Sequence, residues 1–363
     1  MMTNYQSDLA IHPGEFLEEV LEDIGMSQAE LSKRVGRPIQ AINEIIKGKK
    51  SITSATAIEL EDVLKIPAHI WIGLESEYQI VKAREQEIEQ MQEETALLPN
   101  FPYLELSKIG LVKTTRKAIE KVEELKRFFS VAKLEQIAQV KSFQPAFRVS
   151  NHKTVSHEAI ATWLQAAHLK AEEVQTEEYN RKLLNTSLEA IKDAMNYEDV
   201  NKSITEVKAI LTKCGVALVL LPHFKGTKVH GATFWTNSNA KAVIAMSLRG
   251  SFSDVFWFGL FHEIGHILIH KKREVFLEDG CDDPKLKKQE DEADQFAKDF
   301  LIPQKDFDSF AEEKDFSRTN VVEFAKELNI KPSILVGRLM HEEYIKFNHY
   351  PLQELRDRYK WAT

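Results

Sequence analysis

The sequence is poor in cysteine and contains no long apolar run, and each absence narrows the class of protein. Only two cysteines occur among 363 residues, Cys214 and Cys281, and they lie far apart in the chain. A disulfide framework is therefore not expected, and a reducing, cytoplasmic compartment is the default. No apolar stretch approaches the roughly 20 residues that span a bilayer, and residues 1–10 lack the basic start and apolar run of a secretory signal. We expect a soluble protein that has no membrane partner.

Basic residues are also in the minority, since 48 lysines and arginines face 56 aspartates and glutamates and give a net charge of −8. This balance argues against indiscriminate nucleic-acid binding. The stretch from residue 33 to 50 is an exception, because it holds six basic residues and a single acid, in the order Lys33, Arg34, Arg37, Glu44, Lys47, Lys49 and Lys50. One face of this region is therefore expected to attract phosphate while the rest of the chain repels it.

Residues 12–75 carry the apolar spacing and the cap residues of short helices. Ser27, followed three residues later by Glu30, is a capping box for the second of these helices. Gly36 makes the turn between the second helix and the third. Two short helices joined by such a turn form a helix-turn-helix, in which the second helix fits the DNA major groove. We expect helices over residues 13–24, 27–35 and 38–47, and a fourth helix that Thr53 or Ser54 caps and that ends at Leu64.

The helix expected over 38–47 is the candidate for reading DNA. Amide side chains such as those of Gln40 and Asn43 can form two hydrogen bonds with adenine, and an arginine can do the same with guanine. Lysines that follow the helix are suited to phosphate. The alternative is a small helical bundle whose lysines are only solvated. The expected DNA-binding residues are Gln28, Arg37, Ile39, Gln40, Asn43, Lys47, Lys49 and Lys50.

Several short segments of this region form a sequence pattern that is known from other proteins. They are His-Pro-Gly-Glu at 12–15, Met-Ser-Gln-Ala-Glu-Leu at 26–31, Ile-Asn-Glu-Ile at 42–45, Gly-Lys-Lys-Ser-Ile-Thr at 48–53 and Thr-Ala at 56–57. Together they resemble the HigA-type antitoxins of the Xre helix-turn-helix group over about residues 12–83. The resemblance implies a homodimer that binds a palindromic operator in double-stranded DNA. Many relatives carry arginine where this chain has Ala41, so the base preference does not carry over.

Beyond this region the pattern is helical, with a few strands. Residues 76–127 are polar and predict a helical extension and a linker, and residues 128–212 look all helical. Strand patterns appear later, at 216–221, 230–235 and 240–246. Further helices are expected over 254–270, 286–301 and, as a final pair, within 318–348. The sequence therefore predicts a mainly helical protein with a small sheet, an α+β fold.

A metal-binding motif lies in the helix expected over 254–270. His262-Glu263-Ile264-Gly265-His266 has the H-E-x-x-H pattern, and residues four apart share a helix face, so both imidazoles can bind one Zn²⁺. Glu263 can reach a water on the metal and act as general base and then as proton donor. The alternative is a core helix with two structural histidines. Because buried histidines that face each other need a partner, a metal is favoured.

A third ligand is expected from the helix over 286–301, where Glu290 and Glu292 are both candidates. Asp294 is four residues beyond Glu290 and shares its helix face, so it can accept the second N–H of a zinc-bound histidine. His270 is expected to lie near the metal ligands, or in the core, rather than to bind the metal itself. Two histidines and one carboxylate leave the zinc an open position, as catalytic sites require.

Further segments of the chain form, together with the metal-binding motif, a pattern that is known from other proteins. They are Phe-Arg at 147–148, Ala161 and Trp163, Gly-Ala-Thr-Phe-Trp at 231–235, Ser-Leu-Arg at 247–249, residues 290–297 and Pro303. In combination they resemble the ImmA/IrrE peptidase-like family over about residues 145–345. The resemblance implies that zinc or another divalent metal is used to cleave or inactivate helix-turn-helix repressors, and its helix pattern assigns the third ligand to Glu290.

Two functions remain open from the sequence. The first is a DNA-binding regulator or antitoxin with a zinc endopeptidase that cleaves a repressor or another partner, such as a cognate toxin. The second is a DNA-binding antitoxin whose metal domain senses or binds a partner without cleaving it. Glu263 favours the first, because a purely structural site needs no base beside the metal. The expected domains are a helix-turn-helix at 1–78, a helical linker at 79–144 and the metallopeptidase-like domain at 145–363.

Overall fold

The structure, a computed structural model, describes residues 11–144, 146, 156–236, 241–247, 252–270, 276–277, 284–347 and 350–359. Cys281 and the motif residues at 147–148 and 248–249 lie outside these ranges. The chain divides into two compact units, Met1–Ala96 and Leu97–Thr363. Helices dominate both units and a four-stranded sheet lies in the second, so the expected mainly helical α+β fold is confirmed.

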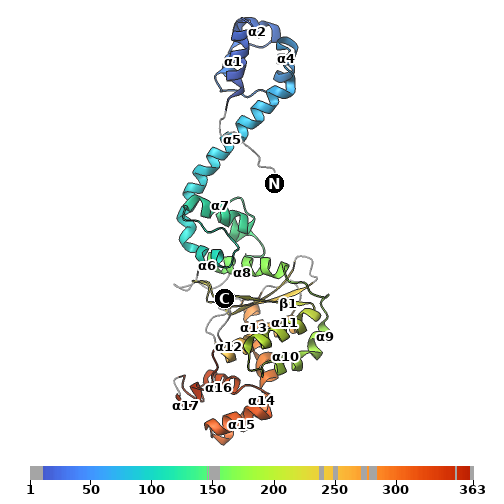
Figure 1. Cartoon of the computed structure of the whole chain (residues 1–363), viewed down its shortest axis with the longest axis vertical. Coiled ribbons are helices and arrows are strands. Elements are labelled where there is room, and N and C mark those ends of the chain that lie inside the picture. The colour runs from blue at the N-terminus through green and yellow to red at the C-terminus, as the bar shows by residue number, and fades with distance from the viewer. Residues whose placement is uncertain are drawn as a thin grey trace. The chain divides into compact units, whose positions relative to one another are not determined.

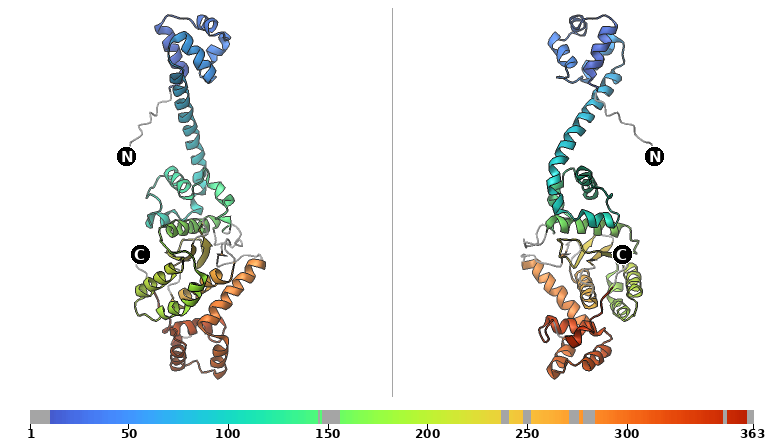
Figure 2. Two further views of the ribbon diagram at one scale, coloured as in Figure 1. Left: turned by 90° about the vertical axis from the view of Figure 1, so that its right-hand side faces the viewer. Right: turned by 60° about the vertical axis from the view of Figure 1, so that its left-hand side comes forward.

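The first unit is helical throughout its described residues (Figures 1 and 2). Its helices are α1 (Pro13–Asp23), α2 (Gln28–Val35), α3 (Ile39–Ile46), α4 (Ser54–Leu64) and α5 (Ala68–Glu94). One side chain or more from each helix enters a common core, which includes Leu17, Leu31, Ile42, Leu60 and Trp71. The helix-turn-helix is therefore held by burial of apolar side chains on its inner faces.

Capping contacts explain where two of these helices begin. The Ser27 hydroxyl accepts a hydrogen bond from the Glu30 amide at 3.2 Å, and the Thr53 hydroxyl accepts one from the Thr56 amide at 3.4 Å. Both helix starts agree with the sequence prediction. The Glu30 carboxylate pairs with Arg34 at 2.8 Å, one turn along the helix, rather than completing the reciprocal half of a capping box.

The helix α5 runs without a break past residue 78, where the sequence analysis placed the end of the first domain. The boundary between the two compact units falls after Ala96. The three-domain division at 78 and 144 stays a prediction.

The segment expected to be a linker contains helices of the second unit that bury apolar side chains. These are α6 (Tyr103–Lys108) and α7 (Ala118–Phe129), with 3-10 turns η1 (Thr95–Asn100) before them and η2 (Leu134–Gln139) after them. Val122, Leu125 and Phe129 of α7 are buried. The high charge of this segment obscured these apolar positions, which recur at helical spacing.

Further helices lead to the sheet, namely α8 (His157–Glu172), α9 (Arg181–Thr186), α10 (Leu188–Ala194) and α11 (Val200–Lys213). Helical structure is interrupted at Ser187, between α9 and α10. Figures 1 and 2 show α8 along one side of the sheet and α11 on the other.

The sheet consists of β1 (Val216–Leu221), β2 (Gly231–Trp235), β3 (Ala242–Ser247) and the two-residue β4 (Phe276–Leu277). The strand order is β1-β3-β2-β4, in which β1 and β3 are parallel and the other pairs are antiparallel. Every residue of β3 is buried, as expected for a strand covered by helices on both faces. The first three strands were predicted, whereas β4 is too short to leave a pattern.

The remaining helices follow the sheet. They are α12 (Ser253–Ile269), α13 (Pro284–Leu301), α14 (Gln304–Glu313), α15 (Arg318–Glu327), α16 (Pro332–His341) and α17 (Tyr350–Gln353). The helices α14 and α17 were not predicted from the sequence. A side chain at Gly265 of α12 would place its Cβ 3.0 Å from Phe296 and 3.4 Å from Ala293, both on α13. The small residues Gly265 and Ala293 therefore allow these two helices to pack closely.

No helix within the described part of the chain has the length and apolar character needed to cross a bilayer.

His168 on α8 gives a testable pH dependence of stability. Its ring lies 4.0 Å from that of Phe234, and its Nε2 is buried with no hydrogen-bond partner among the described residues. Burial lowers the pKa of this imidazole to about 4, from about 6.5 in an unfolded chain. The unfolded chain therefore binds a proton that the folded protein excludes, and stability falls as the pH is lowered from about 6.5 to 4.

We expect this titration to cost up to about 3 kcal/mol of unfolding free energy at pH 4. His168→Gln should flatten the fall, measured by urea unfolding at several pH values between 7 and 4. His69→Gln is the matched control, because His69 is exposed. A slope that is unchanged in His168→Gln would contradict the expectation.

Candidate metal centre and nucleic-acid interface

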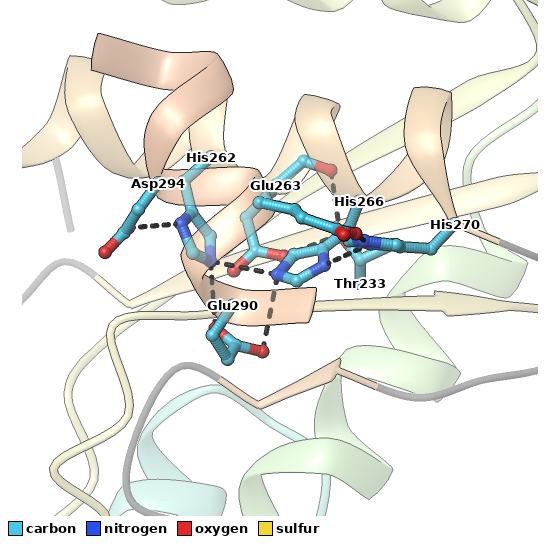
Figure 3. A network of polar contacts seen from close by, with 8 residues as sticks. Thr233, His262, Glu263, His266, His270, Glu290 and Asp294 are labelled. Atoms are coloured by element: carbon cyan, nitrogen blue, oxygen red, sulfur yellow. Dashed lines mark hydrogen bonds and ion pairs between the residues drawn. The ribbon is translucent and has the colours of Figure 1, made fainter. Parts of the chain in front are cut away.

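Three side chains from two neighbouring helices bring their ligand atoms together (Figure 3). His262 and His266, one turn apart on α12, have their Nε2 atoms 2.9 Å from each other. The Glu290 carboxylate of α13 lies 3.1 Å from Nε2 of His262 and 3.4 Å from Nε2 of His266. All the ligand atoms lie within 4.8 Å of one another. Two imidazoles and one carboxylate are a set that zinc takes in catalytic sites, so the residues present fit a divalent metal.

The second nitrogens of both imidazoles also have partners. Nδ1 of His262 lies 2.8 Å from the Asp294 carboxylate, and Nδ1 of His266 lies 3.0 Å from Nδ1 of His270. Nε2 of His270 in turn contacts Glu292 at 3.1 Å. Such contacts fix the ring orientations and leave both Nε2 atoms directed at the same point (Figure 3). The structure thus places Glu290 at the histidine pair, and Glu292 beside His270.

The electrostatics of the three groups suit metal binding. Burial alone would raise the pKa of the Glu290 carboxyl, but hydrogen bonds with His262 and His266 outweigh it and hold that pKa at about 2. Burial lowers the pKa of His266, against the opposing effect of Glu290. An ionised carboxylate and neutral imidazoles are the protonation states that bind a metal.

Glu263 is completely buried and is fixed by the sheet rather than by its own helix. The Thr233 hydroxyl of β2 lies 2.6 Å from Oε2 of Glu263, to which it donates, and 3.2 Å from the Glu263 carbonyl oxygen. A Cβ at Gly231 would stand 2.2 Å from Oε1 of Glu263, so any side chain there would displace the carboxylate. Sequence reasoning missed both residues as partners of Glu263. The only feature of the sequence that could have pointed to Thr233 and Gly231 was their place in the segment 231–235, which belongs to the ImmA/IrrE resemblance.

The candidate reading helix α3 has one buried and one exposed face. Ile42, Ile45 and Ile46 are buried, whereas Ile39 is 53% exposed and Gln40 is exposed. The three lysines that follow the helix, Lys47, Lys49 and Lys50, are also exposed.

Some of the expected DNA-binding side chains contact other side chains of the unit. Nδ2 of Asn43 lies 3.5 Å from Oε1 of Gln28, so α2 and α3 present these two amides together. Nε2 of Gln40 lies 3.1 Å from Glu44. The Arg37 guanidinium forms a two-pronged pair with Glu59 of α4, which sequence reasoning did not foresee. Arg37 must therefore leave Glu59 before it can contact a base.

Two family models match parts of the chain. Residues 218–340 match the IrrE N-terminal-like domain, and residues 17–71 match the helix-turn-helix family. Among curated proteins, Virulence-associated protein I of Dichelobacter nodosus is 35% identical over 77 residues. This match covers 21% of the chain and 71% of that protein.

Several solved structures are also similar to part of the chain. Antitoxin HigA of Pseudomonas aeruginosa, solved with the higBA promoter, is 30% identical over 24% of this chain and 95% of its own, with a TM-score of 0.23. An addiction module antidote protein of the HigA family from Coxiella burnetii is 31% identical over 23% of this chain and 94% of its own, with a TM-score of 0.22.

Proposed function

Because the chain belongs to the helix-turn-helix family in its N-terminal region and to the family of the IrrE N-terminal-like domain in its C-terminal region, as the sequence resemblances predicted, we propose that it is a DNA-binding regulator or antitoxin with a zinc-dependent endopeptidase domain. The peptidase would cleave a repressor or another partner protein. The observation that carries this proposal is the buried Glu263 carboxylate beside two histidines and Glu290.

In this proposal, His262, His266 and Glu290 hold the metal, and Asp294 and His270 orient the two imidazoles. When bound, zinc supplies a Lewis acid and lowers the pKa of a coordinated water. The low pKa of Glu290 supports its assignment, because the carboxylate needs no deprotonation before it binds.

Glu263 is the proposed general base. Its carboxylate takes a proton from the attacking water and then delivers it to the amine that leaves when the peptide bond breaks. Thr233 is a positioning residue, because its hydroxyl donates to Oε2 of Glu263 and restricts rotation of the carboxylate. Gly231 keeps the adjacent space open. Burial of Glu263 excludes bulk water from the proton transfer.

The test of the proposal is zinc content together with cleavage of candidate partners. Proteins encoded next to this chain, such as a toxin or a second repressor, would be incubated with the purified protein, with and without a chelator. Cleavage that the chelator abolishes supports the endopeptidase. Stable binding of a partner with no cleavage would favour the alternative function, a metal domain that senses or binds a partner.

For the N-terminal region we propose that α3 enters the major groove and that two copies of the chain bind two half-sites of a palindromic operator. The exposed lysines after α3 support a role in phosphate binding, and the paired amides of Gln28 and Asn43 support a role in base recognition.

Substitutions in α3 and substitutions of the lysines should therefore change different properties of DNA binding. Gln40→Ala and Asn43→Ala should each lose about 1–3 kcal/mol of discrimination between the operator and other DNA. Lys49→Ala and Lys50→Ala should weaken binding to all DNA and reduce its salt dependence by about one phosphate contact each. Lys82→Ala, an exposed lysine on α5, is the control and should change neither property. Binding titrations with specific and random duplexes at several salt concentrations would measure both effects, and the same uniform loss in all four variants would refute the assignment.

A further inference from the structure

A cavity of about 330 Å³ is lined mainly by residues of α12, α13 and α16. Its lining includes Asp294, whose carboxylate contacts His262, and His230, which directly precedes Gly231 in the chain. Gly231 itself lies against Glu263. The cavity therefore reaches Asp294, which contacts the proposed ligand His262, and the residue before Gly231, which contacts the proposed base.

The cavity continues along the same two helices that hold the centre. On α12 it is lined by Val255 and Phe258, which stand seven and four residues before His262 and so share its helix face. On α13 it is lined by Leu301, seven residues beyond Asp294 and again on the same face. A chain bound at the metal centre can therefore extend a side chain into the cavity without crossing either helix.

The two arginines in the lining already have partners. Arg338 donates to the Ile302 carbonyl oxygen at 2.6 Å and to the Gln304 side chain at 2.6 Å. Arg356 pairs with Asp254 at 2.6 Å. Most of the remaining lining is hydrocarbon, from Val255, Phe258, Leu301, Ile302, Ile334 and Met340.

The volume also restricts what can bind. An apolar cavity of roughly 150 Å³ already accepts benzene, whereas sites for drug-sized ligands range from about 300 to 1,000 Å³. At about 330 Å³, this space suits one large side chain with the backbone that carries it.

We propose that the cavity receives a large aliphatic or aromatic side chain of the protein substrate, close to the bond that is cleaved. Val255 and Phe258 would then determine substrate specificity, because both line the cavity on the helix that carries the histidines. This inference rests on the proposed peptidase function and adds the class of residue that the peptidase selects. Filling such a cavity should favour leucine, methionine or phenylalanine over glycine by roughly 10- to 100-fold.

A binding experiment tests the cavity without requiring cleavage. The full-length, zinc-loaded protein with labelled methyl groups would be titrated with N-acetyl-L-phenylalanine amide and, separately, with N-acetylglycine amide. The first compound should shift the methyl signals of Met340 and Ile334, and the second should not. Val255→Trp should abolish the shifts by filling the cavity. Val322→Trp is the matched control, because Val322 lies on α15 outside the lining.

A cleavage experiment tests the same cavity in catalysis. The wild-type protein and both variants would be incubated with a mixture of peptides from a digested proteome, and the cleavage sites would be read by mass spectrometry. The wild type and Val322→Trp should prefer a large apolar residue at one position next to the cleaved bond. Val255→Trp should lose that preference and accept small residues there. Zinc content and the thermal midpoint of each variant would show that the fold is retained.

The outcomes separate this inference from the peptidase function. Methyl shifts that Val255→Trp abolishes, without cleavage of any peptide or partner, would support the cavity as a site for apolar side chains and overturn the peptidase function. Cleavage with no preference for apolar residues, or with the same preference in Val255→Trp, would overturn the inference and leave the peptidase intact. Absence of methyl shifts with the phenylalanine compound would also overturn the inference.

Discussion

Replacing Glu263 with glutamine should leave zinc binding nearly unchanged and slow cleavage by a factor on the order of 10² to 10⁴, the usual contribution of a general base. Glutamine has nearly the same shape, and its carbonyl oxygen can still accept the hydrogen bond from Thr233. It cannot take a proton from water. Zinc content by elemental mass spectrometry and the rate of partner cleavage would be measured on the same sample.

Glu292→Gln is the matched control for this change. Glu292 carries the same functional group in the same region, but it contacts His270 rather than the three converging ligand atoms. We expect its cleavage rate to stay within a few-fold of wild type. An equal loss of zinc and of activity in Glu263→Gln would instead indicate a structural role for Glu263.

Replacing Glu290 with alanine should weaken zinc binding by more than the roughly 10- to 100-fold that the loss of a residue outside the ligand set costs. Glu290 contacts both histidines, and its pKa of about 2 keeps it ionised at neutral pH. Without it, two imidazoles would remain of the three groups whose ligand atoms converge in the described part of the chain. Competition against a chelator of known affinity would give the zinc dissociation constant.

Glu292→Ala again supplies the comparison. Its carboxylate acts on the centre only through His270 and His266, so we expect a loss of at most about 100-fold. Retention of tight zinc binding by Glu290→Ala together with its loss in Glu292→Ala would reverse the assignment. The 2.8 Å contact of Asp294 with Nδ1 of His262 would then be the remaining support for its role, because the argument from its position one turn beyond Glu290 would no longer apply.

The features that the sequence could predict are local ones. Spacing within a helix determines which side chains share a face, so a zinc-binding pair could be expected at His262 and His266. Short cap motifs likewise marked the start of α2 at Ser27 and limited the start of α4 to Thr53 or Ser54. Each of these patterns involves residues only a few positions apart, so the geometry of the helix backbone alone determines how their side chains are arranged.

Features that depend on contacts between distant segments could not be predicted in this way. The hydrogen bond from Thr233 to Glu263 requires a strand to lie against a helix in one register. The pair between Arg37 and Glu59 depends on how α3 packs against α4. The cavity is lined by residues as far apart in the chain as His230 and Arg356. No periodicity in the sequence encodes such contacts.

The most direct test of the central claim, that the C-terminal domain is a metal-dependent endopeptidase, is an intact-mass measurement on a partner protein. The protein product of a neighbouring reading frame would be incubated with the full chain carrying one equivalent of zinc, with the chain after chelation, and with the chelated chain after zinc is restored. We predict two fragments whose masses sum to that of the partner plus one water, present in the first and third samples and missing from the second. A partner that keeps its full mass in all three samples while forming a stable complex with the chain would contradict the claim.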